Sequence, residues 1–231
     1  MAESIKQDWI QTVVPGRTFA DIGGLGGNAV NEMVSCALES GATEATMVDV
    51  LPVGHPLRSD FHERCRQRGF DGYHCLQADL DSPVNIGPWD VVHCSGVIYH
   101  TPDPVRMILR LSSLCSEYLI FTSMVVPPVI DNRFGRLDLS AGRAVFVPAI
   151  DGEVKTICAE HFEALGIQIL GINSSAQFSW LMFDGNFNYG PWWWLFSEDY
   201  VKRLLVLAGF TVLIREETWP GRAVSFLCLK D

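Results

Sequence analysis

Short apolar segments alternate with amphipathic segments along the first half of the chain. Five segments have the length and the mostly apolar character of buried strands: residues 18–23, 45–50, 73–79, 89–94 and 118–123. Three segments between them carry apolar residues at helical spacing: residues 28–40, 55–70 and 105–115. Strands that alternate with helices in this way predict an α/β fold, with a parallel sheet covered on both faces.

The last part of the chain follows a different order. Ser197, with two acidic residues behind it, is a typical helix N-cap and predicts a helix that ends near Gly209. Residues 210–218 and 223–230 have strand character, and only four residues separate them, so they must form an antiparallel hairpin. Residues 125–191 show no such regular pattern, and we interpret them as an insertion after the fifth strand of a single domain spanning residues 1–231.

Composition and charge narrow the possible functions. The chain has 231 residues, 48% of them hydrophobic, and a formal net charge of -10. A broad phosphate-binding surface is therefore unexpected, and we predict that nucleic acid is not a partner. No apolar run approaches the length of a membrane span, and the seven cysteines are scattered without a CxxC pair. We expect a cytoplasmic protein without a membrane partner.

The segment "FADIGGLGGNAV" places four glycines just after the first strand, and it fits two ligand motifs. Gly24, Gly26 and Ala29 match the G-x-G-x-x-G/A turn of dinucleotide-binding proteins, with Asp49 at the distance of a ribose-binding acid. Asp21, Gly23 and Gly27 match instead the first motif of Rossmann-like methyltransferases, although Leu25 stands where that motif has its middle glycine. A carboxylate before the glycines would repel a pyrophosphate, so Asp21 favours the second interpretation.

Further motifs extend this match. "DIGGLGG", "VDV", "QAD" and "DVVHCSGVIYHTPDP" follow successive strands, and "EDYVKRLLVLAGF" precedes the final hairpin. In this combination the chain resembles the class I S-adenosylmethionine-dependent methyltransferases, over residues 19–123 and 193–230. The resemblance implies a Rossmann-like three-layer sandwich with a mostly parallel seven-stranded sheet. The strand-four motif is similar to that of small-molecule, natural-product methyltransferases and of carboxymethyl-transferring wobble-uridine enzymes.

The resemblance also implies a set of residues that bind S-adenosylmethionine. Those that would surround its methionyl part, its ribose and its adenine are Asp21, Gly23, Gly24, Gly27, Asp49, Asp79, Cys94 and Ser95. Asp49 would accept hydrogen bonds from the ribose hydroxyls, and Asp79 would accept a hydrogen bond from the adenine amino group. Each has a simpler alternative: Asp49 as a solvated acid at a strand end, Asp79 as a loop or helix-capping acid, and Cys94 as a buried thiol.

His100 is the candidate catalytic base, and Tyr99 is a weaker second candidate. Both follow the fourth strand, at the carboxyl edge of the sheet where ligands bind in open α/β folds. An ordinary histidine pKa of about 6.5 suits removal of a proton from a hydroxyl. The alternative is that "YHTPDP" only packs and caps the next helix. An enzyme can also accelerate methyl transfer only by holding the acceptor atom in line with the methyl group, so a catalytic base is not strictly required.

We expect no catalytic metal. Asp131 and Asn132 are placed like the metal ligands of catechol-type methyltransferases, but the acid that those enzymes need after the fourth strand is missing, since that place reads "HCSG".

The insertion carries nine aromatic residues between Phe178 and Phe196. We interpret residues 125–191 as a cap over the reacting methyl group, with substrate-binding candidates Asp184, Asn186, Tyr189 and Trp193. The same aromatic residues would also suit a homodimer interface. The leading hypothesis is a methyltransferase that acts on a small molecule, more often at oxygen than at nitrogen. The alternatives are a tRNA wobble-uridine-modifying transferase, an NAD-dependent oxidoreductase, and a ligand-binding relative without turnover.

Overall fold

A computed structural model describes residues 2–26, 32–83, 85–150, 152–219 and 222–231. Its centre is a seven-stranded sheet with the order β10-β11-β5-β4-β1-β2-β3. The five parallel strands are β1 (Thr18–Ile22), β2 (Glu44–Asp49), β3 (Tyr73–Gln77), β4 (Trp89–Ser95) and β5 (Cys115–Met124). The hairpin of β10 (Phe210–Trp219) and β11 (Ala223–Lys230) completes the sheet, and β11 runs antiparallel to β5. The predicted mostly parallel sheet with a terminal antiparallel hairpin is confirmed.

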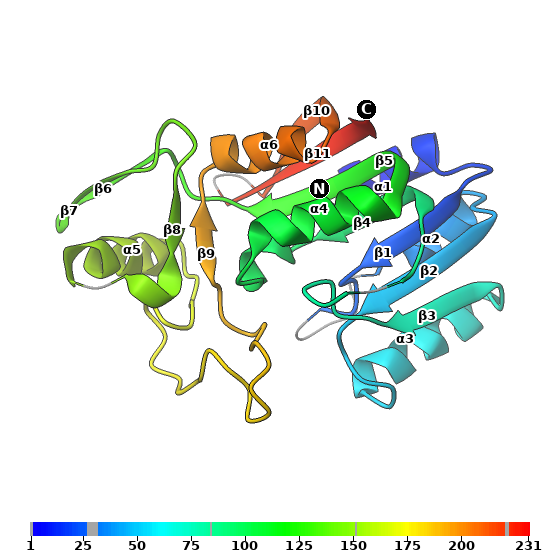
Figure 1. Cartoon of the computed structure of the whole chain (residues 1–231), viewed down its shortest axis with the longest axis horizontal. Coiled ribbons are helices and arrows are strands. Elements are labelled where there is room, and N and C mark those ends of the chain that lie inside the picture. The colour runs from blue at the N-terminus through cyan, green and yellow to red at the C-terminus, as the bar shows by residue number, and fades with distance from the viewer. Residues whose placement is uncertain (1, 27–31, 84, 151, 220–221) are drawn as a thin grey trace.

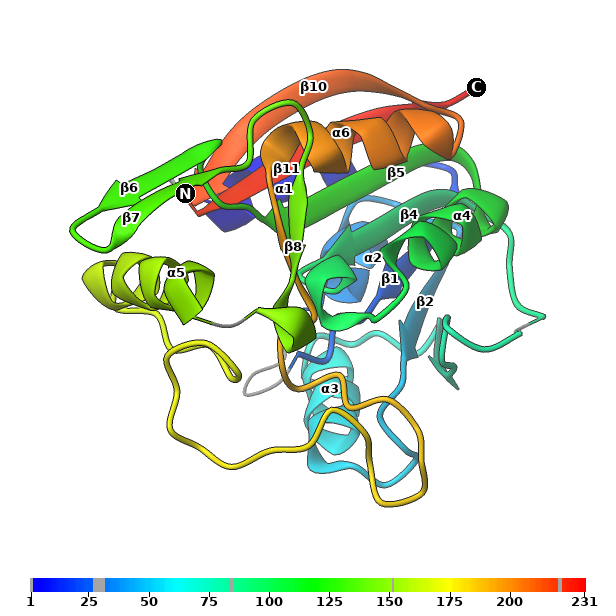
Figure 2. The ribbon, with the colours of Figure 1, turned by 60° about the vertical axis from the view of Figure 1, so that its left-hand side comes forward.

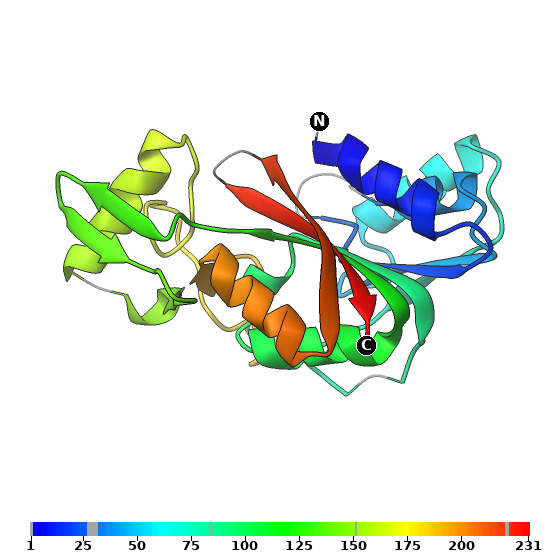
Figure 3. The ribbon, with the colours of Figure 1, turned by 90° about the horizontal axis from the view of Figure 1, so that it is seen from above.

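Helices cover both faces of the sheet, which gives three layers (Figure 3). One face carries α1 (Ala2–Val13), α2 (Val34–Glu39) and α3 (Pro56–Gln67), and the other carries α4 (Pro104–Leu114) and α6 (Glu198–Leu207). Consecutive strand residues point to opposite faces, so Phe19 belongs to the first apolar core and Ala20 to the second. The predicted three-layer sandwich is therefore confirmed.

The predicted helix starts are confirmed at two places. Asp103 caps α4 by accepting from the backbone N–H of Arg106 at 2.9 Å, and Pro104 is its first residue. Ser197 caps α6 through the backbone N–H of Tyr200. In contrast, the helix expected over residues 28–40 begins only at Val34, and residues 27–31 lie outside the described part of the chain.

Two helices lie where the sequence analysis assigned no regular element. Helix α1 buries Trp9 and Val13, and with Ile5 these residues recur every four positions on the face against the sheet. Helix α5 (Gly152–Ala164) buries Ile157 and Phe162 within the stretch interpreted as irregular. That interpretation of residues 125–191 was wrong over α5, because its polar residues obscure a narrow apolar face.

The segment between β5 and α6 packs around an apolar cluster of its own. It contains two small antiparallel pairs, β6 (Val129–Asn132) with β7 (Gly135–Asp138) and β8 (Ala144–Phe146) with β9 (Trp194–Phe196), together with α5 and the 3-10 turn η2 (Val147–Ala149). Figures 1 and 2 show that this segment lies beyond the carboxyl ends of the parallel strands. None of the helices in the described ranges is both long and apolar enough to cross a membrane.

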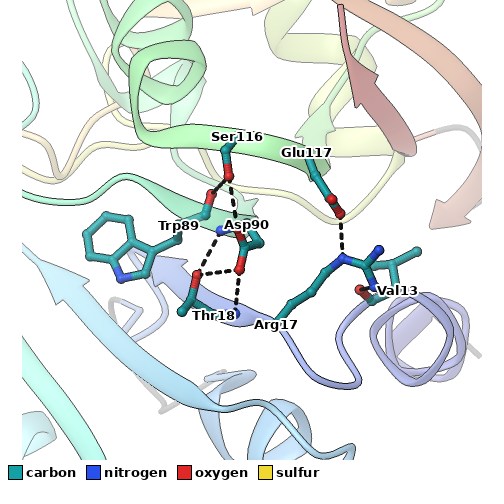
Figure 4. A network of polar contacts seen from close by, with 7 residues as sticks. All are labelled: Val13, Arg17, Thr18, Trp89, Asp90, Ser116 and Glu117. Atoms are coloured by element: carbon teal, nitrogen blue, oxygen red, sulfur yellow. Dashed lines mark hydrogen bonds and ion pairs between the residues drawn. The ribbon is translucent and has the colours of Figure 1, made fainter.

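A polar network joins β1, β4 and β5 at the opposite, amino-terminal edge of the sheet (Figure 4). One Asp90 oxygen accepts from the Thr18 backbone N–H and from the Thr18 hydroxyl, each at 2.9 Å. Its other oxygen accepts from the Ser116 hydroxyl at 3.1 Å. Beside this network, Arg17 pairs with Glu117. The bond from the Thr18 N–H is the main reason why the pKa of Asp90 is lowered.

We expect Asp90→Ala to lower the free energy of unfolding by about 1 to 2 kcal/mol at neutral pH, a value reduced for solvent screening because the carboxylate is partly exposed. Since the folded-state pKa is lowered, this stability is present above the ordinary aspartate pKa and is lost as the pH falls through the folded value. Urea unfolding at pH 7 and pH 3 measures both effects, with the exposed Asp71→Ala as control. If Asp90→Ala lowered the free energy of unfolding equally at pH 7 and pH 3, the ionised Asp90 carboxylate would not be the stabilising group.

Candidate functional site

A cavity of about 380 Å³ opens at the carboxyl edge of the sheet, within the usual range for small-molecule sites. Its walls come from the segments that follow β1, β2, β3 and β4, and from the end of the β5–α6 segment. The lining includes five residues predicted from sequence: Gly23, Asp49, Asp79, His100 and Tyr189. The residues that sequence reasoning missed include Asp81, Val97 and Thr101.

Neighbouring side chains leave no room for a Cβ atom at either Gly23 or Gly24. Gly23 has φ +77°, and a Cβ at this position would lie 2.5 Å from Val97 Cγ2. A Cβ on Gly24 would lie 2.2 Å from Asp21 Oδ2, so Gly24 makes room for that carboxylate rather than lining the cavity. The predicted Gly27, and Ala29 of the dinucleotide interpretation, lie outside the described residues.

Asp49 stands at the end of β2 with both carboxylate oxygens held by backbone N–H groups. Leu51 donates to Oδ1 at 2.9 Å and Leu25 donates to Oδ2 at 3.2 Å, which joins the glycine turn to the end of β2. Burial is the largest effect on this carboxyl and raises its pKa, although the two backbone bonds and the Arg58 guanidinium oppose the shift. The geometry leaves the remaining lone pairs free to accept from a ligand.

Arg58 is a buried residue of α3 that fixes this part of the site from below. Its guanidinium donates to the backbone carbonyls of Leu51, Asp49 and Leu76 at 2.8, 3.2 and 2.9 Å. It therefore holds the ends of β2 and β3 together beneath the cavity. Sequence reasoning missed this role, because Arg58 reads as one of several polar residues on an amphipathic helix.

A second acidic group lies across the cavity, at the exit of β3. The Tyr189 hydroxyl lies 2.9 and 3.0 Å from the two Asp79 oxygens and donates to that carboxylate. Asp81 accepts from the buried Thr101 hydroxyl at 2.7 and 2.8 Å, and burial raises its pKa. Asp79 thus meets a residue of the β5–α6 segment at the position where the sequence analysis expected an adenine contact.

His100 ends the 3-10 turn η1 (Ile98–His100) and reaches the cavity wall. Its Nδ1 lies 3.0 Å from the carbonyl oxygen of Pro191. Because a carbonyl only accepts, Nδ1 carries the proton, and the lone pair of the neutral ring is on Nε2. Burial lowers the pKa of His100, so the ring is neutral at pH 7. Its predicted partner Tyr99 is buried outside the cavity lining, with its ring 4.5 Å from those of His100 and Trp192.

Asp21 lies beneath the glycine turn, fully buried, and does not line the cavity. Its Oδ1 is 2.7 Å from Nδ1 of His93, its neighbour on β4, and its Oδ2 accepts from the Met33 backbone N–H at 2.7 Å. The carboxylate therefore joins the start of the glycine loop to the residue before α2. His93 was not singled out from sequence, since only strand pairing brings it beside Asp21.

The other predicted residues do not belong to the lining of the cavity. Cys94 is in the core, where burial raises the pKa of its thiol. Ser95 is half-buried at the end of β4 and accepts from Lys6. Asp184 and Asn186 bond to each other in an exposed turn, and Trp193 is buried against Trp180 and Phe187.

A metal site finds no support in the described part of the chain, which holds no group of three or more His, Cys, Asp or Glu side chains placed to bind an ion. Asp131 instead pairs with Arg136 at 3.3 Å, and Asn132 donates to the carbonyl of Ile157.

The sequence matches no protein-family model and no curated protein. Solved structures nevertheless match over the whole chain. Magnesium protoporphyrin IX methyltransferase from Synechocystis PCC 6803, with bound S-adenosylhomocysteine, is 14% identical with a TM-score of 0.59, covering 99% of this chain and 82% of that one. An S-adenosylmethionine-dependent methyltransferase from Mesorhizobium loti is 16% identical with a TM-score of 0.55, covering 100% and 98%.

A third match is 1,6-didemethyltoxoflavin-N1-methyltransferase from Burkholderia thailandensis, solved with its substrate and S-adenosylhomocysteine. It is 14% identical with a TM-score of 0.56, and the match covers 99% of this chain and 76% of that one. The fold of this chain is therefore the Rossmann-like fold of S-adenosylmethionine-dependent methyltransferases, as the resemblance implied.

Proposed function

We propose that the protein transfers a methyl group from S-adenosylmethionine to a small-molecule acceptor, at an oxygen atom. The observation that carries this proposal is the charge of the cavity. Three carboxylates line it, Asp49, Asp79 and Asp81, whereas no Lys or Arg is among the described residues of its lining. A dinucleotide would bring a pyrophosphate dianion into this acidic site, which is unfavourable. S-adenosylmethionine brings a sulfonium and an ammonium, which an acidic cavity attracts.

The residues around the cavity fit the parts of this cofactor. Asp49 keeps lone pairs for the two ribose hydroxyls, and Leu51, Leu80 and Met107 supply apolar walls for a flat base. Gly23 and Gly96 both have positive φ, and they let the exits of β1 and β4 approach a ligand closely. When bound, S-adenosylmethionine supplies a methyl group that is activated by attachment to a positively charged sulfur.

His100 completes the reaction by taking the proton that the acceptor loses. Its neutral Nε2 would take the proton that a hydroxyl acceptor loses, while bound S-adenosylmethionine would supply the methyl group from its positively charged sulfur and leave as a neutral thioether. The Pro191 carbonyl keeps Nδ1 protonated and fixes the direction of the ring. General-base catalysis of this kind contributes about 10²- to 10⁴-fold.

Residues 125–191 act in this proposal as the cap that closes the site. Tyr189 and Gly190 form part of the cavity wall, and Pro191 holds His100, so the cap contributes to both the cofactor side and the base. Two of the three solved structures named above are methyltransferases of magnesium protoporphyrin IX and of 1,6-didemethyltoxoflavin. Together with the acidic cavity and the net charge of -10, these small-molecule substrates support a small-molecule acceptor rather than tRNA.

Thermal unfolding in the presence of S-adenosylmethionine or NAD tests which cofactor binds. Transfer of a labelled methyl group tests which kind of molecule accepts it. S-adenosylmethionine should raise the unfolding midpoint and NAD should leave it unchanged. The enzyme is then incubated with methyl-labelled S-adenosylmethionine and a cell extract. Label recovered in a low-mass product with an O-methyl group supports the proposal. Label recovered in RNA, or a midpoint raised by NAD alone, contradicts it.

Two further predictions about the protein as a whole belong to this proposal. All seven cysteines are free thiols, which supports a reducing, cytoplasmic location. The turn at Asp184 exposes Leu181, Met182, Phe183 and Phe187, which supports a homodimer through the aromatic insertion.

A further inference from the structure

Residues 189–191 link two walls of the cavity. At one end the Tyr189 hydroxyl donates to Asp79, at the exit of β3, and lies 2.9 and 3.0 Å from its two carboxylate oxygens. At the other end the Pro191 carbonyl accepts from Nδ1 of His100 at 3.0 Å. The proline ring fixes its own φ angle, so the link is short and stiff. A shift of the chain at one contact is therefore transmitted to the other.

The contact between Tyr189 and Asp79 is a strong one. Burial and the nearby carboxylates of Asp81 and Asp79 raise the pKa of Tyr189, so its hydroxyl keeps its proton and donates. A hydrogen bond to a carboxylate is about twice as strong as one between neutral groups. Asp79 also accepts from the Asp81 backbone N–H at 2.9 Å, which fixes the direction of the carboxylate. Since a carboxylate has about four acceptor positions, this contact leaves room for a ligand at Asp79.

The tautomer of His100 depends on the other end of the link. Burial lowers the pKa of His100, and the backbone carbonyls of Pro191 and Tyr189 oppose that shift. In a neutral imidazole ring, the hydrogen bonds that the ring makes decide which nitrogen carries the proton, and here the Pro191 carbonyl selects Nδ1. If that carbonyl moved away, the ring would be distributed between both tautomers. In one of them Nε2 carries the proton and has no lone pair to act as a base.

Residues 188–193 form a small loop that is supported on both sides of the cavity. The Trp193 indole N–H donates to the Asn188 carbonyl at 2.9 Å and closes the loop. The Trp193 backbone N–H donates to the Tyr99 carbonyl at 2.8 Å, which supports the loop next to the base. The Tyr189 hydroxyl supports the loop at the exit of β3. The position of the loop therefore depends on both contacts.

We infer that Tyr189 is a positioning residue for the base. Its contact with Asp79 keeps the Pro191 carbonyl in place, and that carbonyl keeps the proton of His100 on Nδ1 and the lone pair on Nε2. Without the Tyr189 hydroxyl the loop can turn about its support at Trp193, and such a turn carries the Pro191 carbonyl away from the ring. The inference rests on the proposed function, because it concerns the base of that reaction. It gives the cap control over the protonation of the base.

The test measures the tautomer of His100 in the full chain without any ligand. Nitrogen-15 NMR of histidine-labelled protein distinguishes protonated from unprotonated ring nitrogens, and the signals that are missing from His100→Gln assign this residue. At pH 8, above the ordinary histidine pKa of about 6.5, the wild type should show His100 as a single Nδ1–H tautomer. Tyr189→Phe should convert it to a mixture of both tautomers. Tyr189 is only half-buried and the variant keeps the ring, so the fold is retained.

Tyr73→Phe is the matched control, because its hydroxyl lies 2.9 Å from Nδ1 of another histidine, His62. It should change the signals of His62 and leave those of His100 as in the wild type. Calorimetric titration with S-adenosylhomocysteine separates positioning from ligand binding. The affinity of Tyr189→Phe should change less than about threefold, because the role concerns the base.

Two results would overturn the inference while the proposed function stands. One is a His100 ring that stays a single Nδ1–H tautomer in Tyr189→Phe, and the other is a mixture of tautomers already in the wild type. A large loss of affinity with an unchanged tautomer would belong to the first case and make Tyr189 a ligand-binding residue instead. If the wild-type protein does not bind S-adenosylhomocysteine, the proposed function fails, whereas the NMR measurement still decides whether Tyr189 positions His100.

Discussion

Replacing His100 by Gln should lower kcat by about 10²- to 10⁴-fold, the contribution of a general base. Glutamine keeps a side-chain N–H that can donate to the Pro191 carbonyl, but it offers no base in place of Nε2. Affinity for S-adenosylhomocysteine should change less than about threefold, because the proposed role concerns the acceptor proton. Steady-state rates and calorimetric titration of the same preparation separate the two effects.

The pH profile gives an independent check on this role. Burial lowers the pKa of His100, so the wild-type kcat/KM should fall with acidity only below the ordinary histidine value of 6.5. His100→Gln should lack this acidic decrease. A variant that keeps both the wild-type rate and the wild-type profile would remove His100 from the mechanism and leave positioning as the source of catalysis.

Asp49→Asn should weaken the binding of S-adenosylhomocysteine by roughly 100-fold or more, which is about two hydrogen bonds to a charged group. The carboxylate already accepts from Leu25 and Leu51, one bond at each oxygen. An amide has one acceptor oxygen, and its NH₂ group faces a backbone N–H wherever it is turned. The variant therefore loses one of the two hydrogen bonds from Leu25 and Leu51, and it also loses oxygen lone pairs that would accept from the ribose hydroxyls.

The matched control is Asp60→Asn, an exposed acid on α3 that should bind as the wild type does. Protonation of the Asp49 carboxylate should weaken ligand binding as the substitution does. Since burial raises the pKa of Asp49, wild-type affinity should begin to fall at a higher pH than the ordinary value of 3.8 would give. Unchanged affinity in Asp49→Asn would mean that the ligand lies elsewhere along the sheet edge.

The sheet and its order of elements were predictable because each element carries a local signal. Buried strands are short apolar runs, the Asp103–Pro104 pair marks the start of α4, and four residues between two strands allow only a hairpin. The missed helices had a signal as well, such as Ile5, Trp9 and Val13 at helical spacing in α1. In α5 the signal is weaker, because its apolar residues form a narrow face among charged ones.

The site was predictable only where the residues stand at the ends of strands. Asp49 is the last residue of β2 and Asp79 follows β3, so a parallel sheet brings them to one edge. The contacts that complete the site join distant parts of the chain: His93 with Asp21, Tyr189 with Asp79, and His100 with Pro191. Such pairs depend on strand register and on helix packing, which no local pattern encodes.

Calorimetric titration with S-adenosylhomocysteine, with NAD titrated in parallel, tests the central claim most directly. The proposed cofactor site predicts saturable binding of one S-adenosylhomocysteine per chain, and no heat from NAD. Absence of binding to S-adenosylhomocysteine at millimolar concentration, or saturable binding of NAD in its place, would contradict the proposed methyl transfer.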